Sequence, residues 1–117
     1  DGFDRRAEVE KSESSLKQAG YDLLNALEAA KLDLNNSWNS LVKSNAAFEV
    51  QKKFQDASEE RAEIAGAQYS TGLVSFDNWI IIEDDLIRSR KAMLNAKTSA
   101  ALAEAAWNRA KGVGLDE

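Results

Sequence analysis

The feature that most constrains the fold is the near absence of helix breakers over two long segments. The 117 residues contain no proline, and three of the six glycines, Gly2, Gly112 and Gly114, lie close to the ends. A chain that makes several turns normally places proline and glycine at them. Alanine makes up roughly a sixth of the residues, and together with leucine, glutamate, lysine and glutamine it is among the strongest helix formers. We therefore expect few turns and long α-helices.

The first segment, from about residue 3 to residue 68, carries only Gly20 and Gly66 as weak points. Its apolar residues recur at spacings of three, four and seven, which is typical of an amphipathic helix or a coiled-coil seam. At about 1.5 Å per residue the predicted helix is roughly 100 Å long. The main stripe consists of Leu16, Leu23, Leu27, Ala30, Leu34, Leu41 and Phe48, and a weaker one beside it of Leu24, Trp38 and Val42.

Small residues lie close to both stripes and let neighbouring helices approach closely. Two adjacent apolar stripes indicate helical neighbours on two sides of this segment rather than on one. The small residues are Ala19, Ala26, Ser37, Ser44, Ala62 and Ala65.

The break falls in the stretch from Tyr69 to Asp77, which reads YSTGLVSFD. Gly72 suits the left-handed position just after a helix C-terminus. Ser75 suits an N-cap, and Asp77 then lies in the first turn, where the helix dipole favours an acid. A connection this short makes the two helices antiparallel neighbours.

The second helix is predicted from about residue 76 to residue 111, ended by Gly112 and Gly114. Folding the chain back around Leu73 brings Trp107 level with residues near Trp38, and Met93 level with Phe54, so that bulky residues meet across the hairpin. The apolar positions of this helix are Trp79, Ile80, Ile82, Leu86, Met93, Ala96, Ala100, Ala103 and Trp107.

The predicted fold is therefore all-α, a single domain over residues 1–117 that forms a long antiparallel two-helix coiled-coil hairpin. Its tip spans about 69–76, and residues 112–117 form a C-terminal tail. The second helix covers only about half of the first, so the leucines at 16, 23, 24 and 27 keep no partner within the chain. Because a two-helix hairpin also buries little core, we expect the chain to associate with copies of itself or to belong to a larger protein.

Composition argues against several classes of function. A net charge of −5 and a pI near 4.8 are unsuited to nucleic acid, whose phosphates need a basic surface. No apolar run approaches the ~20 residues of a membrane span, so direct membrane insertion is not expected. Without histidine or cysteine, the common catalytic bases, nucleophiles and transition-metal ligands are missing. We expect no catalytic residues, no metal site and no cofactor.

The tip and the second helix resemble the TolC-like outer-membrane efflux protein family. The resemblance lies in the Tyr-x-x-Gly-x-x-Ser-Φ pattern of Tyr69 to Phe76, where Φ is apolar, then Asp77, Asn78 and Trp79, followed by Glu83 and Leu86. An alanine-rich helix from Ala92 to Ala110 and the Gly-containing break after it complete the pattern. The long helix before the tip, Ala7 to Ala67, looks like the helix that precedes it in the C-terminal half of family members.

The resemblance implies a trimeric protein of the bacterial outer membrane, with a periplasmic helical tunnel continuous with a β-barrel. Each protomer supplies two helical hairpins, whose tips close the tunnel and dock onto a periplasmic adaptor, or membrane fusion, protein. This chain would be the second hairpin of one protomer, taken from a longer protein and lying in the periplasm. Its expected partners are then copies of itself, as a trimer, and the adaptor.

The resemblance also suggests site residues. Tyr69, Gly72, Leu73, Val74, Ser75 and Phe76 form the expected adaptor-docking tip, and the apolar ones among them suit a hydrophobic clasp that stabilises the turn equally well. Tyr69 either caps the first helix or bonds a neighbouring hairpin. The expected polar residues of the tunnel end are Asp77, Asn78, Glu83 and Asp84.

Two departures and one alternative stand beside this reading. Asn78 and Ile81 occupy positions where some members carry acids, and Glu83, Asp84 and Asp85 form either a solvated face or a cation-favouring ring. The tip lacks a basic residue that some members use for closure.

The alternative is a free-standing coiled-coil scaffold or the hairpin of an adaptor, which would show apolar a and d heptad positions with complementary e and g charges. Here the a and d positions after Phe48 become Gln51, Gln55, Ser58 and Ala62.

Overall fold

The computed structural model describes residues 2–112, and within them it contains two α-helices and no strand. Helix α1 runs from Gly2 to Ser70 and helix α2 from Phe76 to Ala110. Both helices agree with the predicted segments to within two residues. The tip is shorter than predicted, because α1 extends through Tyr69 and Ser70. Of the predicted tail 112–117, residues 113–117 lie outside the described residues.

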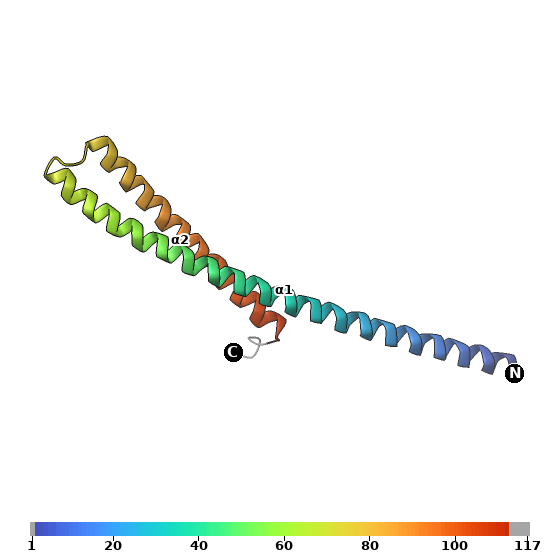
Figure 1. The fold of residues 1–117 in the computed structure, drawn as a ribbon. Helices are drawn as coiled ribbons and strands as arrows, with labels where there is room; N and C mark the ends of the chain where they lie inside the picture. The colour runs from blue at the N-terminus through green and yellow to red at the C-terminus, as the bar shows by residue number, and fades with distance from the viewer. Residues whose placement is uncertain (1, 113–117) are drawn as a thin grey trace. The chain divides into compact units, whose positions relative to one another are not determined.

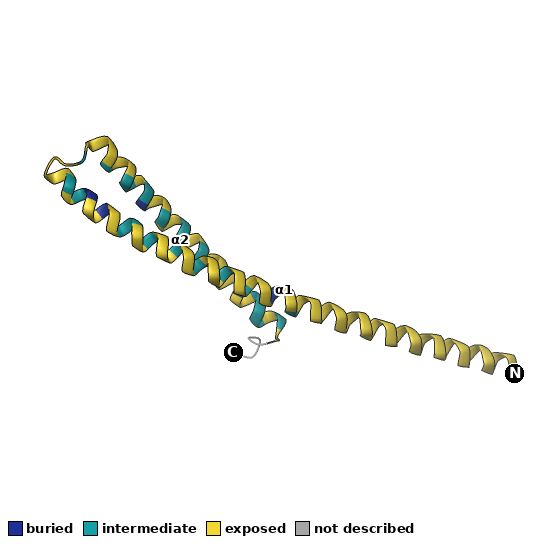
Figure 2. Cartoon of the chain, viewed as in Figure 1, coloured by how far each residue is buried: buried dark blue, intermediate teal, exposed yellow. Residues whose placement is uncertain are grey.

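The chain divides into two units, residues 1–36 and residues 37–117. In the first unit the described residues from Gly2 to Asp33 are all exposed, as the yellow ribbon in Figure 2 shows. Leu16, Leu23, Leu24 and Leu27 are between 57% and 77% exposed. This exposure agrees with the prediction that the first apolar stripe has no cover there.

The second unit is an antiparallel hairpin, in which α2 returns alongside the C-terminal part of α1 (Figure 1). The predicted register is confirmed by the two tryptophans, since the rings of Trp38 and Trp107 lie 5.1 Å apart between centroids. Two ion pairs also cross the hairpin, Arg61 with Asp85 and Arg90 with Glu59. The chain therefore reverses once within the described residues, between Ser70 and Phe76.

The covered residues on the inner face of the hairpin recur at alternating spacings of three and four, as in a coiled coil. On α1 the covered positions are Leu34, Ser37, Leu41, Ser44, Phe48, Gln51, Gln55, Ser58, Ala62 and Ala65. The most deeply buried of them are small, with Ser37 and Ala62 each 7% exposed and Ala65 2%. On α2 the most buried residues are Leu86 and Ala103, at 5% and 9%. The hairpin thus packs by close approach of small side chains more than by interlocking large ones.

Some predicted core residues lie elsewhere. Phe54 is 60% exposed, so the predicted meeting of Phe54 with Met93 across the seam is wrong. Phe54 directly precedes the seam position Gln55, and one residue along a helix turns its side chain by about 100°. Trp38 is 50% exposed and Ile80 37%, so neither lies in a buried core.

Candidate functional site

The turn at the tip is a complete Schellman motif. Gly72 has φ +76°, in the left-handed region, and its N–H donates to the carbonyl of Tyr69 at 3.1 Å. The N–H of Leu73 donates to the carbonyl of Gln68 at 2.8 Å. These two hydrogen bonds satisfy the last carbonyls of α1 in the manner typical of a glycine stop. The prediction of Gly72 as the residue that ends the first helix is confirmed.

The start of α2 is capped by Ser75, as predicted. The backbone of Ser75 is extended, and its hydroxyl accepts a hydrogen bond from the N–H of Asn78 at 3.2 Å. Val74 and Trp79 occupy the two positions of a hydrophobic staple, just before the cap and in the first turn, and both are half-buried. Asp77 lies in the first turn, where it complements the helix dipole. Each of the few residues of the turn therefore has a defined local role.

Three aromatic rings join the helices beside the turn. The ring of Tyr69 stacks on that of Trp79, with centroids 4.7 Å apart and planes 8° apart. Phe76 lies 6.1 Å from Tyr69 and 6.0 Å from Trp79, tilted against both. The Tyr69 carbonyl is therefore capped by the N–H of Gly72, while its side chain joins the end of α1 to the start of α2. The Nε1 atom of Trp79 is buried and has no hydrogen-bond partner among residues 2–112.

The apolar side chains of the turn are divided between the two predicted roles. Val74 is half-buried and belongs to the staple. Leu73 is 77% exposed and Phe76 54%, so Leu73 does not make the apolar contact that often accompanies a Schellman motif. The hydrophobic clasp at this tip is made by the aromatic rings instead. Leu73 is left as an exposed apolar side chain on a well-bonded turn.

The acidic residues after the tip do not form one continuous patch. Asp77, Asn78 and Asp84 are exposed, whereas Glu83 is half-buried. Asp85 faces α1 and forms an ion pair with Arg61 at 3.3 Å. Asp85 is therefore paired within the hairpin and is not a free charge of the expected acidic ring. The exposed acids of this region are Asp77 and Asp84.

A second ion pair lies one to two turns further from the tip. Arg90 donates from Nε and from a terminal nitrogen to the two carboxylate oxygens of Glu59, at 2.7 and 2.9 Å. This bidentate hydrogen bonding lowers the pKa of Glu59 and raises the pKa of Arg90. Both cross-hairpin ion pairs lie beside the seam. They follow from the register of the two helices, and the sequence pattern of either helix alone does not predict them.

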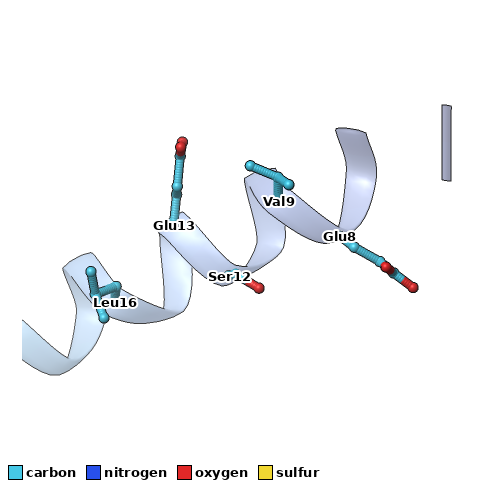
Figure 3. Close-up of a pocket in the computed structure, with 5 residues that line it drawn as sticks. All are labelled: Glu8, Val9, Ser12, Glu13 and Leu16. Atoms are coloured by element: carbon cyan, nitrogen blue, oxygen red, sulfur yellow. The ribbon is translucent and has the colours of Figure 1, made fainter. Parts of the chain in front are cut away.

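No metal cluster is found in the part of the chain that the structure describes. No group of three or more His, Cys, Asp and Glu side chains converges there. Hollows on the first unit are lined by a single stretch of helix, such as the one beside Val9 and Leu16 (Figure 3). One exposed helix face does not surround a substrate. Within residues 2–112, no helix is long and apolar enough to cross a membrane.

Comparison with known proteins identifies no family: no family model, no curated protein and no solved structure matches this chain. The class that the fold defines is an α-helical hairpin. The candidate site is its tip, and any function assigned to that tip depends on the geometry given above.

Proposed function

We propose that this chain is the periplasmic tunnel hairpin of a trimeric outer-membrane efflux or secretion channel, and that its tip docks onto a periplasmic adaptor protein. The proposal joins the sequence resemblance of the Tyr69 to Phe76 segment to the geometry of the turn. The partner suited to such a tip is another helical hairpin that offers an apolar pocket at its own end.

The observation that carries the proposal is the exposure of Leu73, at 77%. Exposed single leucines are common on protein surfaces, but this one projects from a turn whose backbone groups are bonded on both sides. A turn held in this way loses little conformational freedom on binding, which favours affinity. Phe76, at 54% exposure, adds an aromatic surface next to it.

The rest of the hairpin is consistent with a place in a larger helical wall. Its buried seam is made mainly of small residues, so the two helices by themselves bury little apolar surface. The exposed leucines of the first unit also call for cover by other helices. Asp77, Asn78 and Asp84 are exposed near the tip, where copies around an axis would bring like charges together and favour cations.

The docking proposal is tested by cross-linking. A photoreactive residue is placed at position 73, and the chain is mixed with the purified helical hairpin of a periplasmic adaptor. We expect a cross-link from position 73. With the photoreactive residue moved to position 76, we expect a cross-link that Leu73→Asp abolishes, while circular dichroism shows unchanged helicity. Leu102→Asp is the matched control, because Leu102 is 67% exposed but lies near the far end of α2.

A cross-link that survives Leu73→Asp, or that Leu102→Asp abolishes equally, would refute docking through the tip.

The tunnel itself is tested by conductance of the assembled channel. Asp77→Asn with Asp84→Asn is expected to lower its preference for cations, whereas Asp85→Asn, which changes a carboxylate already paired with Arg61, is expected to change it less.

A second candidate is a free-standing coiled-coil scaffold or an adaptor-type hairpin, and one observation favours it. The seam keeps its heptad spacing along the hairpin, and the two ion pairs join e with e and g with g positions, as in antiparallel coiled coils. Polar or small residues at Gln51, Gln55 and Ser58 weaken such a seam when it stands alone. Full thermal stability of an isolated monomer of residues 37–117 would favour the scaffold.

A further inference from the structure

Two apolar stripes remain exposed on the hairpin, one on each helix. On α1 the stripe consists of Val50, Ala57 and Ile64, and on α2 of Ile80, Ile87 and Leu94. Within each stripe the residues are seven apart, so they line up along one side of the helix. The large members are between 37% and 60% exposed. We call them the α1 stripe and the α2 stripe.

The stripes lie on opposite sides of the hairpin. Counting heptad positions from the buried seam, the α1 stripe falls on the same flank as Arg61, whereas the α2 stripe falls on the flank of Arg90. Neither stripe can therefore cover the other within one chain. Two copies placed side by side can bring the α1 stripe of one against the α2 stripe of the next.

The stripes also match in level along the hairpin. The Arg61–Asp85 ion pair marks two residues that lie opposite each other. Ile64 is three residues nearer the tip than Arg61, and Ile80 is five residues nearer than Asp85. Val50 is eleven residues farther from the tip than Arg61, and Leu94 is nine residues farther from the tip than Asp85. Both pairs agree to within two residues, or about 3 Å of helix rise, so the stripes meet without a shift when both tips point the same way.

Charges beside the stripes agree with this arrangement on one edge. Arg61 lies between Ala57 and Ile64, and its side chain is 60% exposed. Asp84 lies between Ile80 and Ile87, at nearly the same level, and is exposed. Side by side, Arg61 of one copy and Asp84 of the next carry opposite charges across the contact, which favours this pairing and its direction. The other edge carries both signs on each side, with Lys53 and Glu60 facing Glu83, Arg90 and Lys97.

We infer that the hairpin associates side by side with further copies of itself, the α1 stripe of one copy packing against the α2 stripe of the next, with all tips at one end. Such a contact uses two different surfaces of the chain, so it continues from copy to copy and closes into a ring if the rotation permits. The contact does not rest on the tunnel proposed above, because it is argued from the stripes of this chain alone. Leu73 lies outside both stripes, so failure of docking at the tip and failure of this contact are distinguishable.

Cysteine cross-linking tests the register, because the chain has no native cysteine. Chains of residues 1–117 carrying Ile64→Cys and Ile80→Cys, one of them isotope-labelled, are mixed and oxidised, and the mixed dimer is identified by mass. We expect this pair and the pair Val50→Cys with Leu94→Cys to cross-link. In the control mixture, Ile64→Cys and Leu94→Cys differ in level by twelve residues, or about 18 Å, and are expected to remain uncross-linked.

Sedimentation tests the two-sided nature of the contact. A charge in either stripe, as in Ala57→Glu or Ile87→Glu, is expected to weaken self-association roughly tenfold or more. A mixture of these two variants is expected to form a 1:1 complex that grows no further, since each retains one intact stripe. All chains also carry Leu23→Glu and Leu27→Glu. These substitutions place charges among the exposed leucines of the first unit, so that association through that unit is disfavoured. Equal cross-linking of matched and displaced pairs, no cross-link at all, or variants that assemble like the parent would overturn the inference.

Discussion

The rings of Tyr69 and Trp79 lie parallel, 4.7 Å apart, and join the last turn of α1 to the first turn of α2. This contact spans a connection of only five residues between the helices. Together with the Schellman hydrogen bonds and the Ser75 cap it fixes the direction in which the chain returns. The position of Leu73, and therefore the proposed docking surface, depends on it.

Removing one ring of this pair should destabilise the tip. We expect Tyr69→Ala to lower the free energy of unfolding by about 1–2 kcal/mol, mainly from lost ring stacking, because Tyr69 is 40% exposed. Trp79→Phe should cost much less than Trp79→Ala, because it keeps an aromatic ring and removes the buried Nε1 that has no partner within residues 2–112. Denaturant unfolding of the three variants checks this order, and a Trp79→Phe as damaging as Trp79→Ala would contradict it.

Gly72 and Gly66 should respond in opposite directions to alanine. Gly72 has φ +76°, and a Cβ built there meets no atom within 4 Å, so Gly72→Ala pays only for its backbone conformation, about 1 kcal/mol. Gly66 lies inside α1 with similarly open space, so Gly66→Ala should stabilise by about 0.5–1 kcal/mol. Melting temperatures of the two variants decide the matter, and two shifts of the same sign would show that the turn differs from the one described.

The small residues of the seam should tolerate no enlargement. Ala65 is 2% exposed, so Ala65→Leu forces the helices apart and should cost about 1–3 kcal/mol. Ala67→Leu is the matched control, because Ala67 is exposed two residues away in the same helix and should change stability by less than about 0.5 kcal/mol. Chemical denaturation compares them directly. Equal effects would mean that Ala65 does not face α2.

The Glu59–Arg90 pair should make stability depend on pH on the acidic side. The hydrogen bonds from Arg90 lower the pKa of Glu59 below its ordinary value of 4.5 in the folded chain. The stabilisation is therefore present above pH 4.5 and is lost as the pH falls through the lowered folded pKa. We expect Glu59→Gln to flatten this part of the pH profile, and added salt to weaken the effect because the pair is exposed. An unchanged profile between wild type and Glu59→Gln would count against the pair in solution.

Much of the hairpin could be predicted from the residues because its signals are local. Gly72 and Ser75 act through hydrogen bonds to residues within five positions, so the turn and both helix ends follow from short-range rules. The Trp38–Trp107 contact followed in turn from the position of the turn, since two straight helices leave no freedom once the reversal is placed.

The parts that could not be predicted depend on angles around the helix axes. The size of Phe54 predicts a place in the seam, yet Phe54 precedes the seam position Gln55 by one residue and is exposed. Predicting the aromatic cluster and the two ion pairs requires the rotation of each helix about its axis as well as the register between the helices. The acids at Glu83, Asp84 and Asp85 are separated for the same reason, since successive residues point about 100° apart.

The most direct test of the hairpin is a nuclear Overhauser contact between the rings of Trp38 and Trp107. Their centroids lie 5.1 Å apart, whereas an unbroken helix would place them about 100 Å apart. An isotope-filtered experiment on a mixture of labelled and unlabelled chains separates contacts within a chain from those between chains. The hairpin predicts ring-to-ring contacts within single chains. Their absence, or their appearance only between chains, would contradict the reversal at Gly72 and the docking tip built on it.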